Sequence, residues 1–164
     1  MTYAGKERLY RIVIVVLLLV IAAMAYKFIV AGSTAAGADG RTAVLLEPGE
    51  RAFVLREMRG FLVGLQRMTD ALTRDDMQAV AQVARELGTQ KGHDAPVSLM
   101  GKLPLEFKKL AFGVHGDFDA IAAEAGGGGQ SKRTLAQISA VLQKCTACHE
   151  QYQFDAARQG PQAP

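Results

Sequence analysis

The chain has 164 residues, of which 49% are hydrophobic, and its formal net charge is +3 from 19 Lys and Arg against 16 Asp and Glu. This length suits one domain with one small core, and the mild charge, without a dense basic patch interleaved with aromatics, gives nucleic-acid binding no support. The sequence contains no phosphate-binding loop, nucleophile–base pair or paired carboxylates on one helix face, so we do not expect an enzyme.

The N-terminal segment contains an apolar run over residues 12–26, which continues at 28–30 beyond Lys27. If the Lys27 side chain extends toward the interface, the stretch approaches the roughly 20 residues that a transmembrane helix needs. We therefore expect residues 1–31 to form a single membrane anchor.

The charges beside this run predict its orientation. Lys6, Arg8 and Arg11 precede it, and the positive-inside bias places such a flank in the cytoplasm. We expect a single pass of a bacterial inner membrane, with the remainder of the chain in the periplasm. A cleaved signal peptide is the alternative, because residues 36–38 (Ala-Gly-Ala) have the small-residue spacing of a cleavage site.

The segment after the anchor is small and polar. Residues 31–41 have the composition of a flexible tether, and a short apolar patch at 43–46 precedes Pro48. We expect residues 32–47 to be a linker. No segment alternates with a period of two over a useful length, so we predict no strand.

Four amphipathic helices are predicted beyond the linker. The first spans about 48–73, with Pro48 in its first turn; the second starts at Asp75-Asp76 and stops at Gly88. A loop at 89–98 and a helix over about 99–125 follow, for which Pro104 is an alternative first turn, and Ser131 caps the last helix. The apolar stripes of the first and last helices are Leu55, Met58, Leu62, Leu65, Thr69 and Leu72, and Leu135, Ile138, Leu142, Cys145 and His149. Phe61 and Met68 widen the stripe of the first helix.

The last helix carries the most specific motif. Cys145, Cys148 and His149 form C-x-x-C-H, and the two cysteines are the only ones in the chain. This pattern is the attachment signature of a c-type haem. The two thiols add to the haem vinyl groups, and the histidine ligates the iron. We therefore expect one covalently attached haem c.

Three other interpretations of the two cysteines remain open. A structural zinc site needs four ligands, and the other histidines, His93 and His115, stand alone far upstream. A thioredoxin-type redox pair normally opens a helix after a strand, and nothing strand-like precedes Cys145. A plain disulfide is the third alternative.

The order of these features resembles that of the class II c-type cytochromes, the cytochrome c′ and cytochrome c-556 family. The resemblance is carried by the C-terminal haem motif, by residues 55–62 (LREMRGFL) and by residues 110–115 (LAFGVH). It implies an all-α fold in which residues 48–157 form an antiparallel four-helix bundle. Residues 158–164 would then be a disordered tail.

The resemblance also implies the iron ligands. His149 would be the proximal ligand, and in the low-spin branch of the family a methionine of the first bundle helix, here Met58, is the sixth ligand. Met68 is a weaker candidate, and an open site that binds nitric oxide or carbon monoxide is the alternative. His115 could touch the haem edge. Arginines of the first helix could pair with the haem propionates; these are Arg51, Arg56, Arg59 and Arg67.

The expected function is one-electron transfer by a membrane-tethered cytochrome. Its partners would be redox proteins, including a membrane respiratory or photosynthetic complex, and the family resemblance leaves a homodimer open. An accessory haem subunit of a larger membrane complex is another alternative, because small residues near the outer end of the anchor, Ala22, Ala23 and Ala25, would permit close helix packing.

Overall fold

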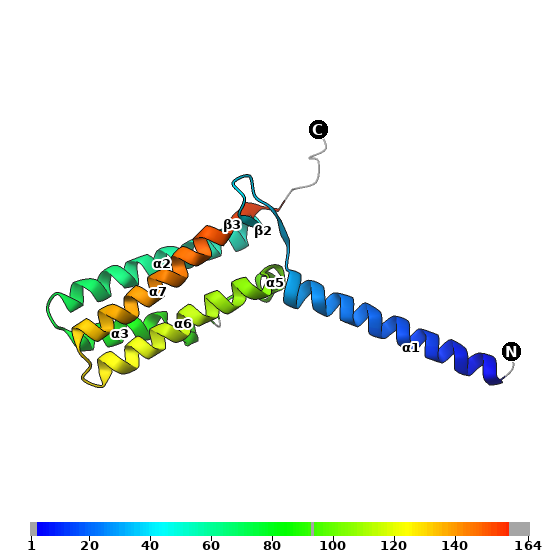
Figure 1. Cartoon of the computed structure of the whole chain (residues 1–164), viewed down its shortest axis with the longest axis horizontal. Coiled ribbons are helices and arrows are strands. Elements are labelled where there is room, and N and C mark those ends of the chain that lie inside the picture. The colour runs from blue at the N-terminus through cyan, green and yellow to red at the C-terminus, as the bar shows by residue number, and fades with distance from the viewer. Residues whose placement is uncertain (1–2, 93, 158–164) are drawn as a thin grey trace.

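The computed structural model describes residues 3–92 and 94–157, and this part of the chain is mostly helical (Figure 1). Helix α1 (Tyr3–Ala25) and the π-helical turn η1 (Tyr26–Ala31) lead into the rest of the chain, here called the head. The long helices of the head are α2 (Pro48–Leu72), α3 (Met77–Leu87), α6 (Leu105–Gly126) and α7 (Ser131–Gln151). His93 and the tail predicted at 158–164 lie outside the described residues.

The N-terminal helix matches the predicted anchor in length and composition. Within the described ranges, Lys6–Ala31 is the one helical stretch long and apolar enough to cross a membrane. None of its side chains is buried against the head. The apolar surface of α1 therefore has no partner within the described part of the chain.

The predicted starts of α2 and α3 are confirmed, and each has a local cause. Pro48 occupies the first turn of α2, and the Glu47 amide N–H donates to the Glu50 carboxylate at 3.0 Å. The Asp76 carboxylate accepts from the Ala79 amide N–H at 3.0 Å and caps α3.

The prediction that one helix starts at about residue 99 is wrong, because the chain breaks at Leu103 and Pro104, and the alternative start at Pro104 lies close to the observed one. A short helix, α5 (Val97–Lys102), precedes the break, and α6 follows it. Proline has no amide proton and restricts the residue before it, so Leu103 is extended, with φ −76° and ψ 131°. The predicted loop at 89–98 also contains one helical turn, α4 (Thr89–Gly92), and the start of α5.

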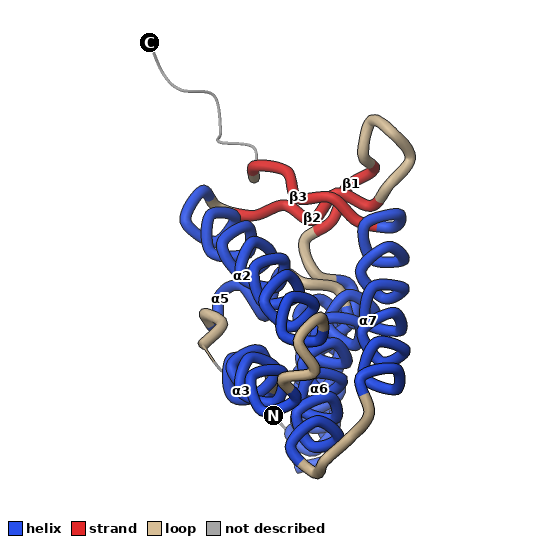
Figure 2. Tube along the Cα trace, turned by 90° about the vertical axis from the view of Figure 1, so that its left-hand side faces the viewer, coloured by secondary structure: helices blue, strands red, loops and turns tan. Residues whose placement is uncertain are grey.

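The prediction of no strand is wrong as well. A three-stranded sheet lies across one end of the long helices (Figure 2) and consists of β1 (Thr34–Ala36), β2 (Thr42–Leu46) and β3 (Tyr152–Ala156). β2 pairs antiparallel with β1 and parallel with β3, from Thr42 opposite Tyr152 to Leu46 opposite Ala156. The segment 32–47, predicted to be a flexible linker, therefore contains two of the three strands.

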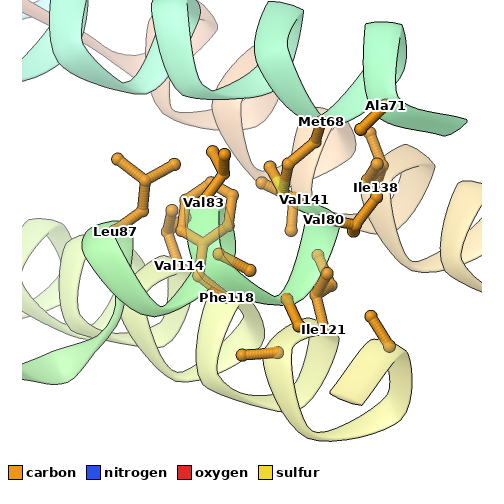
Figure 3. Packing of buried hydrophobic residues seen from close by; sticks show 14 residues of the cluster. Met68, Ala71, Val80, Val83, Leu87, Val114, Phe118, Ile121, Ile138 and Val141 are labelled. Atoms are coloured by element: carbon orange, nitrogen blue, oxygen red, sulfur yellow. The ribbon is translucent and has the colours of Figure 1, made fainter. Parts of the chain in front are cut away.

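Two clusters of buried side chains hold the head together. The first joins α2, α3, α6 and α7 (Figure 3), and its central residues include Met68, Val80, Phe118, Ile121 and Val141. The second joins β2, α2, α5 and α6, and consists of Val44, Leu46, Val54, Leu99, Leu103 and Phe107. The first cluster fills the space between the long helices, and the second lies under the sheet.

The inner faces of α2 and α7 differ from the predicted stripes by about one residue. Leu62 is 68% exposed whereas Phe61 packs on the first cluster, and Leu142 is 46% exposed whereas Val141 is fully buried. The buried side of α7 instead follows Thr134, Ile138 and Val141, with both cysteines on the same side. A shift of one residue rotates a helix face by about 100°. Here it brings Cys148 to the buried side in place of His149, whereas Cys145 lies on both the predicted and the observed face.

We predict that Phe118→Ala lowers the free energy of unfolding by about 3–5 kcal/mol, because it leaves a cavity at a fully buried position. Urea unfolding of the chain in detergent, followed by circular dichroism, measures this change. Leu62→Ala is the matched control, and we expect a change below about 0.5 kcal/mol at this exposed position. Equal losses in both variants would contradict the assigned core.

Candidate functional site

A pocket of about 300 Å³ lies where the two clusters meet. α2, α5, α6, α7 and β3 all contribute to its walls, and the lining is mainly apolar; its larger side chains include Phe53, Phe61, Leu99, Leu103, Phe107 and Val114. The volume is at the lower end of the range for small-molecule sites, about 300–1,000 Å³. The pocket therefore has the size and lining of a site for an apolar cofactor.

The structure brings all four predicted site residues to this pocket. Cys145, Cys148 and His149 line it from the last turns of α7, and Met58 lines it from α2. Both cysteines are half-buried, and His149 is exposed. Cys145 packs against the first cluster and Cys148 against the second, so the motif spans the junction between them.

The alternative sixth ligand, Met68, does not line the pocket. Its side chain is fully buried in the first cluster, where it points from α2 toward Val80 and Val141 (Figure 3). Met58, in contrast, is partly buried and packs against the second cluster at the pocket wall. Of the two methionines weighed as ligands, only Met58 is therefore in a position to face a bound group.

The environment of the two thiols argues against a thioredoxin-type redox pair. Burial raises the pKa of the Cys148 thiol to about 11, with a further contribution from Cys145, and burial also raises the pKa of the Cys145 thiol. Reactive redox cysteines need a lowered pKa, which a helix N-terminus provides, whereas these residues lie near the C-terminal end of α7. The thiols are free and predominantly protonated at neutral pH.

The zinc interpretation has no support in the described residues either. Within the ranges 3–92 and 94–157, no group of three or more His, Cys, Asp or Glu side chains is placed to hold a metal ion. A haem iron is different, because the porphyrin supplies four nitrogens and the protein only the axial ligands. Two thiols and an imidazole on one wall, with a thioether on another, fit such a group.

His115, expected at most at the edge of a haem, lines this pocket. It is 9% exposed, its ring centroid lies 5.2 Å from that of Phe61, and it lines the pocket from α6. Its Nδ1 lies 2.7 Å from the Leu87 carbonyl oxygen, which can only accept, so Nδ1 carries the proton. This hydrogen bond fixes the tautomer in which Nε2 is free to accept a proton or bind a metal. The sequence could have indicated this burial, because His115 lies next to Val114 and near Phe118, and both belong to the buried face of α6.

Five cations also line the pocket, and most of them have partners. Arg41 forms an ion pair with Asp39 at 2.6 Å, and Lys91 forms one with Glu57 at 3.6 Å. Lys144 pairs with Asp117, and Lys108 donates to the carbonyl oxygens of Phe28 and Ile29. Arg51 uses its Nε to donate to the Phe154 carbonyl at 3.2 Å and, in the described part of the chain, has no acidic partner.

The other arginines considered for the propionates do not reach this pocket. Arg67 pairs with Glu86 at 2.9 Å, and Arg56 lies over the Phe53 ring, with its guanidinium carbon 5.2 Å from the centroid. Neither these two nor Arg59 lines the pocket. Arg51 is therefore the remaining member of the predicted set.

Comparison of the chain with protein-family models, with curated proteins and with solved structures finds no match. The chemistry of the site is therefore inferred from its own residues and not from a relative. These are two half-buried thiols, an exposed imidazole and a thioether around one apolar pocket.

We predict that the Cys148 thiol of the haem-free chain alkylates slowly at neutral pH, because the thiolate is the reactive form and burial keeps the thiol protonated. In a Cys145→Ser variant, which leaves one thiol, the rate with iodoacetamide should rise through a midpoint well above 9.0, the ordinary value. The same variant unfolded in urea is the control and should titrate near that value. A midpoint below it in the folded chain would contradict the described burial.

Proposed function

We propose that the protein is a membrane-tethered c-type cytochrome that carries one haem and transfers single electrons. Cys145 and Cys148 would hold the haem covalently, and His149 would ligate its iron. The observation that carries this proposal is the apolar pocket that the C-x-x-C-H motif shares with Met58. No substrate is transformed, so the protein would act as a carrier rather than an enzyme.

A haem bound here supplies a one-electron iron couple. The residues of the chain set its properties. His149 would donate the proximal nitrogen, and the Met58 thioether would fill the sixth position, which favours ferrous iron and excludes gases. The aromatic and aliphatic walls would shield the Met58 side of the haem from water, and Arg51 offers free guanidinium donors for a propionate.

We further propose that α2, α3, α6 and α7 form the antiparallel four-helix bundle of the class II c-type cytochromes. The short connection at 73–76 supports an antiparallel α2 and α3, and the one at 127–130 supports an antiparallel α6 and α7. The shared core of these four helices gives independent support. The haem motif in the last turns of the last helix is the position that this family uses.

The tether would be a single pass of a bacterial inner membrane, with the head in the periplasm. The length and composition of Lys6–Ala31 and the basic flank before it support this orientation. Covalent attachment of haem to C-x-x-C-H takes place on that side in bacteria. The partners would be redox proteins of the same compartment, including a membrane respiratory or photosynthetic complex.

The experiment is an optical spectrum of the haem-loaded, reduced protein with and without carbon monoxide. We expect a low-spin spectrum that carbon monoxide leaves unchanged, because Met58 occupies the sixth position. Met58→Ala should open that position and bind carbon monoxide. A Cys145→Ser, Cys148→Ser double variant should lose covalent haem in a denaturing gel.

His115→Ala is the matched control, because His115 is the other pocket residue with a free ligand atom. If carbon monoxide binds after His115→Ala and not after Met58→Ala, the sixth ligand is His115, and the Met58 assignment is wrong. A high-spin spectrum that shifts with carbon monoxide in the unchanged protein would replace electron transfer with gas binding. Absence of covalent haem would contradict the proposal as a whole.

We predict that Arg51→Gln lowers the reduction potential, because a cation beside the haem stabilises the ferrous form, which carries one charge less. The change should be at most about 40 mV, the one-electron equivalent of the roughly 1 kcal/mol that an exposed ion pair contributes. Arg56→Gln is the control, since Arg56 lies outside the pocket. A redox titration measures both variants, and equal shifts would contradict a specific role for Arg51.

A further inference from the structure

The head is joined to the anchor by a dense set of contacts rather than by a flexible tether. The Lys108 ammonium donates to the carbonyl oxygens of Phe28 and Ile29 at 3.0 and 3.2 Å. The Ser33 amide N–H donates to the Lys102 carbonyl at 2.7 Å. The last turn of the anchor is therefore held by α5 and α6, and the two parts meet at one joint (Figure 1).

Gly32 makes this joint possible. Its φ of +65° lies in the left-handed region, which favours glycine. A Cβ at this position would lie 2.5 Å from the Lys102 carbonyl oxygen and 2.6 Å from the Pro104 nitrogen. The chain therefore turns sharply against the start of α6, and a larger residue would force anchor and head apart.

The short helix α5 lies at this joint and presents an apolar side chain outward. Val97 is 88% exposed at the first position of α5, and Gly101 of the same helix approaches the Phe28 ring. Phe28 and Ile29, on the last turn of the anchor, are themselves more than half exposed. An exposed valine beside the end of an apolar helix lies where a membrane surface would be if that helix crosses the bilayer.

We propose that α5 rests on the lipid headgroup layer of the membrane that α1 crosses, with Val97 inserted among the lipids. This inference rests on the proposed membrane anchor. The occupant is the bilayer itself, because α5 packs against η1, the end of the anchor, where Gly101 approaches the Phe28 ring. Leu103 lies against Gly32 and Lys108 binds the carbonyl oxygens of Phe28 and Ile29, and both also line the proposed haem pocket, so the pocket is held close to the membrane in one orientation.

The test uses the absence of tryptophan from the chain. A Val97→Trp variant has a single tryptophan fluorophore, which lies at α5. The full-length variant is reconstituted with haem in bilayers with and without brominated lipids. We expect the brominated lipids to quench most of its emission, since quenching requires contact. The ratio between the two bilayers cancels any quenching by the haem. Leu62→Trp is the matched control, an exposed aliphatic position on α2, and its emission should not change.

A second variant tests the joint. Gly32→Val added to Val97→Trp should separate the head from the anchor, so the quenching should fall while the chain stays in the membrane. Equal emission of Val97→Trp in both bilayers, with protein retained after alkaline extraction and a normal haem spectrum, would overturn the docking and leave the proposed function intact. Equal quenching at Leu62 would also overturn it. Release of the protein by alkaline extraction would overturn the docking and the anchor together.

Discussion

The parallel pairing of β2 with β3 connects the two ends of the head, and the candidate site depends on it. β2 follows the anchor, and β3 starts at Tyr152, three residues after His149. Arg41, just before β2, donates to the carbonyl oxygens of His149 and Tyr152 at 3.2 and 3.4 Å. It thus provides a hydrogen-bond donor for carbonyl groups that have no partner within the helix at the end of α7. Without this pairing, the last turn of the motif helix would have no fixed relation to the pocket or to the anchor.

The sheet can be this small because it does not have to form alone. Val44 and Leu46 of β2 are fully buried in the second cluster, and the Phe107 ring meets those of Tyr152 and Phe154 edge-on, with centroids 5.4 and 5.5 Å apart. Parallel strands need a long crossover connection. Here the long helices of the head are that connection, so strand pairing and helix packing stabilise each other.

The sequence predicted the features that depend on neighbouring residues. The limits of α2 and α3 follow from caps within a few residues, and C-x-x-C-H is a local motif, so both were found. β3 and Arg41 were missed because their partners lie more than a hundred residues away. β1 and β2 pair locally, but they were missed because neither strand alternates between buried and exposed residues. The helix faces were displaced because the stripes were drawn at three- and four-residue steps through Leu62 and Leu142, whereas packing buries Phe61 and Val141. Met58 lines the pocket because it lies on both the predicted and the observed face of α2.

The joint at Gly32 changes what kind of carrier the proposed cytochrome would be. A flexible tether raises the effective concentration of a haem near many membrane partners, at the expense of orientation. A rigid joint would fix the orientation, so a partner would reach the proposed haem only through the exposed side of the pocket. His149 is the exposed member of the motif, and α5 faces the membrane in the proposed arrangement. Electron exchange would then proceed along the membrane surface, past the His149 end of α7.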